Sequence, residues 1–260
     1  MKIFHQYITT WNDKQVKKLE KFGVKILKPN QPVNVYEDCG NGLKDYLDNL
    51  SIFHVKGVEF SSEELNNAEY SVLNQILLIG YPMPDSNGGY LERTFNTDNY
   101  CSECGIGLEQ KEAFYIKKVP SKKTKIFSLN WVYDELFVER EYYNEIFKPL
   151  GYKFRDVRSS SKPYAIIDSF VQLVIPTIDE SLDISGFDYE ICNTCHYKKT
   201  HPTLTNFFPL QDNPLQTIYK SKEYFGSGAS ARKKIFLSKK MRDLLIETAN
   251  LPKEVFWPCK

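Results

Sequence analysis

The sequence predicts an α+β fold of mixed sheets and short helices, with a C-terminal lobe clamped by a zinc-ribbon-like four-cysteine site that carries a large insertion. Two observations predict it. Short apolar runs typical of strands alternate with short amphipathic stretches typical of helices. Four of the six cysteines form two Cys-x-x-Cys pairs. The 260 residues are 42% hydrophobic, enough to bury a core without relying on metal or disulfides for bulk stability.

An N-terminal α/β lobe is expected over residues 1–95. Apolar residues recur at helical spacing between Asn12, a candidate N-cap, and Gly23, a candidate helix stop. Ser61 and Glu64 have the spacing of a capping box, which predicts the start of a short helix. The other expected elements are a strand at 24–28, a helix at 43–50, a buried strand at 73–80 and a turn at 86–89.

A second lobe, a zinc-binding α+β lobe with both cysteine pairs, is expected over residues 96–260, beyond a turn-rich boundary region at 82–98. Ser238 is a good N-cap for a helix whose apolar face includes Met241 and Leu245. The other expected elements are a helix at 142–147, strands at 151–157, 170–176 and 235–237, and a closing strand at 255–258.

Two segments of the second lobe resemble each other weakly. Residues 136–154 and 235–257 both follow the order short strand, cap position, amphipathic helix, short strand. An ancestral duplication and a common β-α-β segment both explain this pattern.

The cysteine pairs are Cys101 with Cys104, and Cys192 with Cys195. A Cys-x-x-Cys turn places two sulfurs close enough to bind one ion, and glycines such as Gly105 let backbone N–H groups turn toward the thiolates. Two such turns supply the four thiolates of a tetrahedral zinc site. Because four thiolates close the coordination sphere, the expected role of the zinc is structural.

The spacing is unusual, because 87 residues separate Cys104 from Cys192. The longer loop adds only about 1.4 kcal/mol of closure cost, while structural zinc is worth roughly 10–16 kcal/mol in small finger peptides. A shared site is therefore favoured over two unrelated thiol pairs. His196 and His201 are candidate substitute ligands, although ordinary surface histidines are the simpler interpretation.

Other motifs give weaker indications. Residues 192–196 match the c-type haem attachment pattern, but that leaves the first pair unexplained. Neither pair opens a long helix as a thioredoxin-like redox motif does. The glycine-rich segment 225–234 lacks the phosphate-loop pattern and precedes a strand, so a glycine turn feeding a strand is preferred.

Charge and targeting signals restrict the function classes. Net charge is +1, which gives no global argument for binding nucleic acid or membranes. Basic clusters at 117–125 and 231–240 keep nucleic-acid binding as an alternative, although solvated faces explain them as well. With no signal peptide and no long apolar run, we expect a cytoplasmic protein with reduced thiols and no membrane partner.

Several segments together resemble the bacterial double-CXXCG motif proteins over about residues 98–260. The resemblance lies in CSECG at 101–105, WVYDELFVERE at 131–141, FVQLVIP at 170–176, the turn CNTCH at 192–196, YFGSGASARKKIFLSKKMRDLL at 224–245 and VFWP at 255–258. It implies zinc ligation by the four paired cysteines. His196 stands where the motif has glycine, which puts the backbone after that turn in question.

Members of that family are associated with polymorphic toxin systems as predicted immunity proteins. The resemblance therefore implies a non-enzymatic protein that binds and neutralises a cognate toxin. If the toxin is a basic nuclease, an acidic cluster is a candidate contact by charge complementarity. Its members are Asp179, Glu180, Asp183, Asp188 and Glu190. One alternative is a zinc-ribbon nucleic-acid-binding protein. The other is an enzyme with a structural zinc, and the sequence has no positive sign of an enzyme. Cys39, Cys259 and the first lobe have no predicted role.

Overall fold

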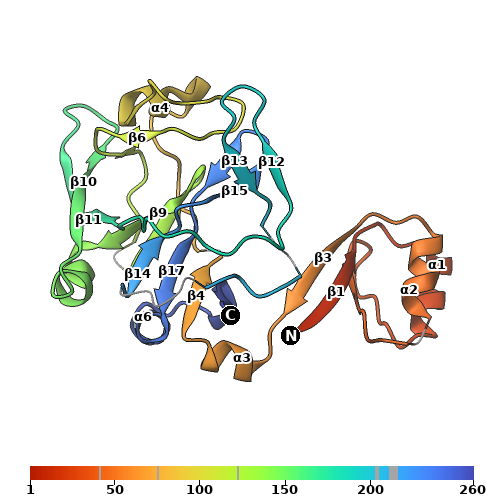
Figure 1. Ribbon diagram of the computed structural model, residues 1–260. Helices are drawn as coiled ribbons and strands as arrows, with labels where there is room; N and C mark the ends of the chain where they lie inside the picture. Colours follow the sequence, from red (N-terminus) through yellow and green to blue (C-terminus); the bar gives the residue numbers. More distant parts are fainter. Residues whose placement is uncertain (41, 75, 122, 203–204, 211–215) are drawn as a thin grey trace. The chain divides into compact units, whose positions relative to one another are not determined.

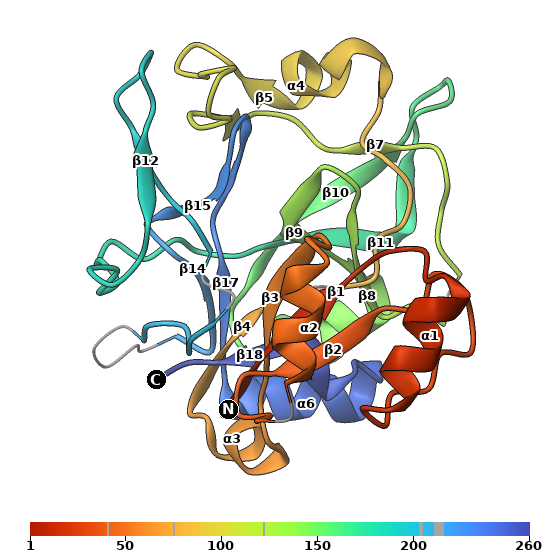
Figure 2. The same ribbon diagram turned by 90° about the vertical axis from the view of Figure 1, so that its right-hand side faces the viewer.

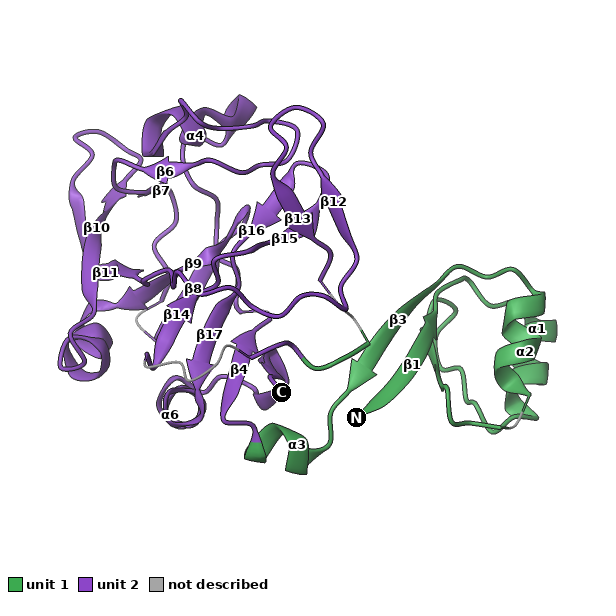
Figure 3. Cartoon of the chain, viewed as in Figure 1, with its two compact units in different colours: residues 1–67, 203–207 green, residues 68–202, 208–260 purple. Residues whose placement is uncertain are grey.

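The computed structural model describes residues 1–40, 42–74, 76–121, 123–202, 205–210 and 216–260. It has the expected α+β class, with short helices between mixed sheets (Figure 1). The chain divides into two compact units (Figure 3): unit 1 is residues 1–67 with the described part of 203–207, and unit 2 is residues 68–202 with 208–260. No described helix has the length and apolar character needed to cross a membrane.

Unit 1 is a three-stranded antiparallel sheet, ordered β2-β1-β3, with three short helices. Its elements are β1 (Lys2–Tyr7), α1 (Asp13–Glu20), β2 (Val33–Tyr36), α2 (Leu43–Asn49), β3 (His54–Glu59) and α3 (Ser62–Asn67). Asn12 begins α1 with a capping box, and Gly23 after it has a φ of 80°, so both predicted helix limits are confirmed. The core includes Tyr7, Trp11, Leu19 and Leu47.

The described residues of unit 2 form four sheets, ordered β7-β10-β11-β9-β8, β14-β17-β4-β18, β12-β13-β15-β16 and β5-β6. Its strands are β4 (Tyr70–Leu73), β5 (Phe95–Asn96), β6 (Glu109–Gln110), β7 (Tyr115–Ile116), β8 (Ile126–Leu129), β9 (Val132–Glu139), β10 (Lys153–Ser159), β11 (Ile166–Val174), β12 (Tyr189–Ile191), β13 (Lys198–Thr200), β14 (Ile218–Lys220), β15 (Tyr224–Ser227), β16 (Ser230–Arg232), β17 (Ile235–Ser238) and β18 (Phe256–Pro258). Its helical segments are η1 (Ser86–Gly88), α4 (Gly89–Thr94), α5 (Arg140–Tyr142), η2 (Tyr143–Phe147), α6 (Lys239–Ala249) and η3 (Lys253–Val255).

Two predicted strands are misplaced. Residues 24–28 form no strand, because the Val24 N–H bonds back to the end of α1 and the sheet takes β2 instead. The strand expected at 73–80 lies earlier, as β4. Its described continuation, 76–80, runs beside β8 with a single isolated bridge, between Leu78 and Ser128; Gln75 lies outside the described residues.

The division between the units also differs from the expected boundary after residue 95. It falls between Asn67 and Ala68. The reason is long-range pairing: β4 lies between β17 and β18, strands from the end of the chain. The turn at 86–89 bends the chain locally within unit 2 as η1 and the start of α4.

The two similar segments of the sequence have matching local structures. The strand before and the strand after each helix flank one antiparallel strand: β11 between β9 and β10, and β4 between β17 and β18. The side chains of Glu139 and Ser238 cap the two helices at equivalent positions. Both helices contribute to one hydrophobic core, through Tyr142 and Phe147 on one side and Met241 and Leu245 on the other.

Candidate metal centre

Each cysteine pair lies at the tip of a β-hairpin. The turn with Cys101 and Cys104 joins β5 to β6, and the turn with Cys192 and Cys195 joins β12 to β13. The two tips lie side by side in both ribbon views (Figures 1 and 2). The 87 residues between the pairs thus fold so that their ends return to one place, as the sequence predicts.

The two turns share one backbone pattern. The N–H four residues after the first cysteine donates to that cysteine's carbonyl, at 2.7 Å after Cys101 and 2.9 Å after Cys192. The N–H of the first cysteine donates to the carbonyl five residues later, at 2.9 Å and 3.0 Å respectively. The same pattern at both tips leaves the two sulfurs of each turn on the side that faces the other turn.

His196 has the same backbone conformation as the glycine of the first turn. It has a φ of 60°, and Gly105, at the equivalent place in the first turn, has a φ of 79°. The surroundings differ: a Cβ on Gly105 would lie 2.4 Å from the Ala229 carbonyl oxygen, whereas His196 is exposed. Histidine is therefore accommodated in the second turn but a side chain is excluded from the first.

The four sulfurs form one cluster. All lie within 4.8 Å of one another, with 3.7 Å between those of Cys101 and Cys192 and 3.4 Å between those of Cys104 and Cys195. All six cysteines are free thiols, so no disulfide consumes a ligand. Three of the four are buried and Cys195 is half-buried. The geometry brings the predicted ligands together as a site that could hold one metal ion.

The environment of the cluster distinguishes its thiols. Burial raises the pKa of Cys104 to about 12. Backbone N–H groups of Cys195 and Thr194 lower the pKa of Cys192 to about 7. Without a cation, the cluster therefore cannot hold four thiolates near neutral pH. A bound cation would stabilise all four negative charges together.

A third hairpin supports the cluster, and sequence reasoning assigned it no such role. The glycine-rich segment, predicted as a turn that feeds a strand, forms a hairpin of β15 and β16. Tyr224 and Ala231 from these strands pack against the cysteines. Its turn also receives the buried Lys199, whose ammonium group donates to the Gly228 carbonyl and pairs with Glu190. In the sequence the glycines of this segment indicate a turn, but not its contact with the cysteines.

The structure separates the five predicted acidic contacts. Asp179, Glu180, Asp183 and Asp188 are exposed, whereas Glu190 is half-buried and paired with Lys199. That ion pair lowers the pKa of Glu190. Glu190 therefore stabilises the hairpin of the second cysteine pair rather than standing free on the surface.

The remaining cysteines and histidines have other surroundings. Cys259 is buried in a hydrophobic core with Phe208 and Phe236, and burial raises the pKa of its thiol. Cys39 is exposed. The His201 ring lies 3.6 Å from the Glu190 carboxylate. The metal-competent group contains the four cysteines and neither His196 nor His201.

Comparisons with known protein families, with curated proteins and with solved structures found no match for this chain.

Proposed function

We propose that the cysteine cluster binds one structural Zn²⁺. Zinc holds four thiolates tetrahedrally at about 2.3 Å, which requires sulfur–sulfur separations of about 3.8 Å. The separations of 3.4 Å and 3.7 Å are close to that value. Cys101, Cys104, Cys192 and Cys195 would fill the coordination sphere, leaving no position for a substrate. The ion would fix two hairpins that no disulfide joins.

We further propose that the protein is a non-enzymatic immunity protein that binds and neutralises a cognate toxin. The observation that carries this proposal is an exposed apolar patch on the hairpin of the second cysteine pair. Tyr189, Ile191 and Tyr197 are 55%, 56% and 55% exposed. Tyr189 and Ile191 alternate along β12, so they project from one face of an edge strand. Exposed aromatic and aliphatic side chains of this kind are typical anchors of protein interfaces.

Charge supports a protein partner near this patch. Asp188 precedes Tyr189, and Asp179, Glu180 and Asp183 lie exposed in the connection from β11 to β12. These four carboxylates are available to a basic partner, whereas Glu190 is engaged by Lys199. We therefore expect the contact surface of the toxin to be basic and to have pockets that accept these apolar side chains.

The nucleic-acid alternative has less support. The basic cluster 231–240 does not form one strip, because its side chains have different environments. Arg232 lies 3.9 Å from Asp134, Lys239 pairs with Asp243 at 2.6 Å, and Lys234 lies over the Phe208 ring. A phosphate-tracking surface needs several cations facing the same way.

The direct test is co-expression with the protein encoded beside this chain's gene, because immunity genes usually neighbour their toxins. We expect a stable complex and rescue of growth. The pair Tyr189→Ala and Ile191→Ser should abolish both without lowering metal content. Lys240→Gln, a change on an exposed part of α6, is the matched control. Retention on nucleic acid that weakens steeply with salt, without a protein complex, would favour the alternative.

A further inference from the structure

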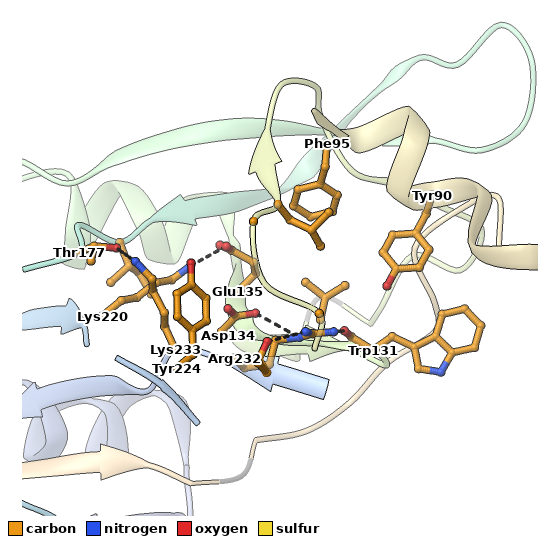
Figure 4. Close-up of a pocket in the computed structure, with 16 residues that line it drawn as sticks. Tyr90, Phe95, Trp131, Asp134, Glu135, Thr177, Lys220, Tyr224, Arg232 and Lys233 are labelled. Carbon is orange, nitrogen blue, oxygen red and sulfur yellow. Dashed lines mark hydrogen bonds and ion pairs between the residues drawn. The ribbon is translucent and has the colours of Figure 1, made fainter. Parts of the chain in front are cut away.

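Unit 2 contains a second candidate site, separate from the cysteine ligands. A cavity of about 200 Å³ lies beside the first cysteine turn, where Gly105 and Gly107 form part of its wall. Its other walls come from α4, β5, β9, β14, β15, β16, the turn before β9 and the segment after β11. Figure 4 shows charged side chains at one end of this pocket and aromatic rings at the other.

At the charged end, cations outnumber carboxylates. The buried Lys220 forms an ion pair with Glu135, and Arg232 lies 3.9 Å from Asp134. Lys233 is left over: its ammonium group donates to the Thr177 hydroxyl at 3.3 Å and has no carboxylate within ion-pair distance among the described residues. The pocket therefore carries an uncompensated positive charge in a half-buried position.

At the other end, Trp131 is held in an unusual backbone conformation. It occupies the two-residue turn between β8 and β9 with a φ of 69°, which bulky residues rarely adopt. The residue is 39% exposed, and its ring stacks on Tyr90, with 5.9 Å between ring centres. The Arg232 guanidinium donates to the Trp131 carbonyl at 3.1 Å, so this turn is tied to the charged end.

A glycine at this turn would avoid the unfavourable backbone conformation. Trp131 instead contacts Tyr81 and Tyr90, with 4.6 Å and 5.9 Å between ring centres, and keeps 39% of its surface exposed. The large exposed ring makes sense as a stacking face, because flat groups stack favourably on aromatic side chains. Tyr224 lies at the charged end, where the Lys233 ammonium group is 5.3 Å from the centre of its ring (Figure 4). Its hydroxyl group has no hydrogen-bond partner in the described part of the chain. It is therefore available to a ligand.

We propose that this pocket binds a small organic anion, with its carboxylate or phosphate at Lys233 and Arg232 and a single flat ring against Trp131 and Tyr90. The size agrees, since about 200 Å³ corresponds to roughly seven water molecules and is below the usual range for drug-sized ligands. Both carboxylates that line the pocket, Glu135 and Asp134, have cationic neighbours. We therefore assign the pocket a binding role. This proposal does not depend on the toxin partner.

The test uses phenylacetate and phenyl phosphate as probes for the two kinds of anion, measured by calorimetry on the metal-loaded full chain. Phenethylamine reverses the charge and cyclohexylacetate removes the flat ring. We expect either or both aromatic anions to bind, and the two controls to bind at least about tenfold more weakly. Equal binding of phenethylamine, or no binding of either aromatic anion at millimolar concentration, would overturn the proposal.

Variants locate the binding. Lys233→Gln should lower the affinity for the anion about tenfold or more, because a hydrogen bond from a charged group is lost. The control Lys240→Gln should leave the affinity unchanged. Trp131→Gly should also weaken binding while its melting temperature holds within a few degrees, because glycine adopts the positive φ freely. If Lys233→Gln binds as the unmodified chain does, the anion lies elsewhere and the assignment is wrong.

Discussion

At the scale of single residues, equivalent positions in the two cysteine turns have the same backbone but different freedom. Gly105 and His196 both follow the second cysteine of their turns with positive φ. The Ala229 carbonyl lies against Gly105, and nothing comparable covers the exposed His196. The two turns therefore differ in the room that they leave for a side chain at this position.

The first prediction compares these positions. Gly105→Ala should lower the free energy of unfolding by about 2–4 kcal/mol, because a Cβ at positive φ would clash with the Ala229 carbonyl. His196→Gly should leave it unchanged or raise it by up to about 1 kcal/mol, since a strained φ is relieved. Denaturant titration with metal analysis checks both. Similar losses for the two variants would contradict the proposed difference between the turns.

The second prediction concerns the ligands. Cys101→Ser should reduce bound zinc from about one per chain to near none and lower unit 2 stability by about 3 kcal/mol or more. Elemental analysis after anaerobic purification and thermal unfolding measure these effects. Cys39→Ser is the appropriate control, because Cys39 is exposed. Cys259 is a poorer control, because its side chain fills a core. Zinc-free protein before substitution would refute the site itself.

At the scale of elements, the strand-helix-strand segments show how similar local sequence gives similar local structure. In both, the strand ends at a capping residue, Glu139 or Ser238, and the helix turns its apolar face to a shared core. Tyr142 and Thr248 join the two helices through a hydroxyl–hydroxyl hydrogen bond of 2.5 Å. The flanked strands differ in chain order: β11 follows its two neighbours, whereas β4 precedes its two neighbours.

The third prediction tests a cap. Ser238→Ala should cost about 1 kcal/mol, because the Met241 N–H loses its acceptor at the start of α6. For a unit of this size the melting temperature should fall by roughly 2–4 °C. Differential scanning calorimetry measures the shift. Ser238→Asp keeps an acceptor and should recover most of the loss; failure to do so would assign the effect to something other than capping.

At the scale of the whole molecule, the units have separate stabilising features. Unit 1 has its own hydrophobic core around Tyr7 and Leu47, and the four-cysteine cluster lies in unit 2. Two of the three tryptophans, Trp131 and Trp257, also belong to unit 2, while Trp11 reports on unit 1.

The fourth prediction follows from this division. Removing the metal with a chelator should lower the unfolding temperature of unit 2 and leave that of unit 1 unchanged, because unit 1 supplies no ligand to the cysteine cluster. Fluorescence of a variant that keeps only Trp11 would follow unit 1 alone. An equal shift of its transition would mean that the metal stabilises unit 1 as well.

The fifth prediction is a pH dependence. Metal binding requires thiolates, and burial raises the pKa of Cys104 to about 12, so a proton must leave when the ion binds. Affinity should therefore fall as pH falls, by about tenfold per pH unit for each proton released. Competition with a chromogenic chelator at several pH values measures the slope. A pH-independent affinity would exclude thiolate ligation.

The sequence by itself determined which four cysteines form Cys-x-x-Cys turns, most helix limits and the α+β class. These depend on local chemistry: a Cys-x-x-Cys turn, a capping box and apolar periodicity are each complete within a few residues. Only the tertiary structure decided the division after Asn67 and the pairing of Glu190 with Lys199. It also decided that Lys233 bonds to the Thr177 hydroxyl and has no carboxylate partner among the described residues. Each depends on groups brought together by strand pairing across long stretches of chain, such as β4 with β17 and β18. Local periodicity shows that a strand forms but does not specify its partner, because pairing energy comes from side chains distant in sequence.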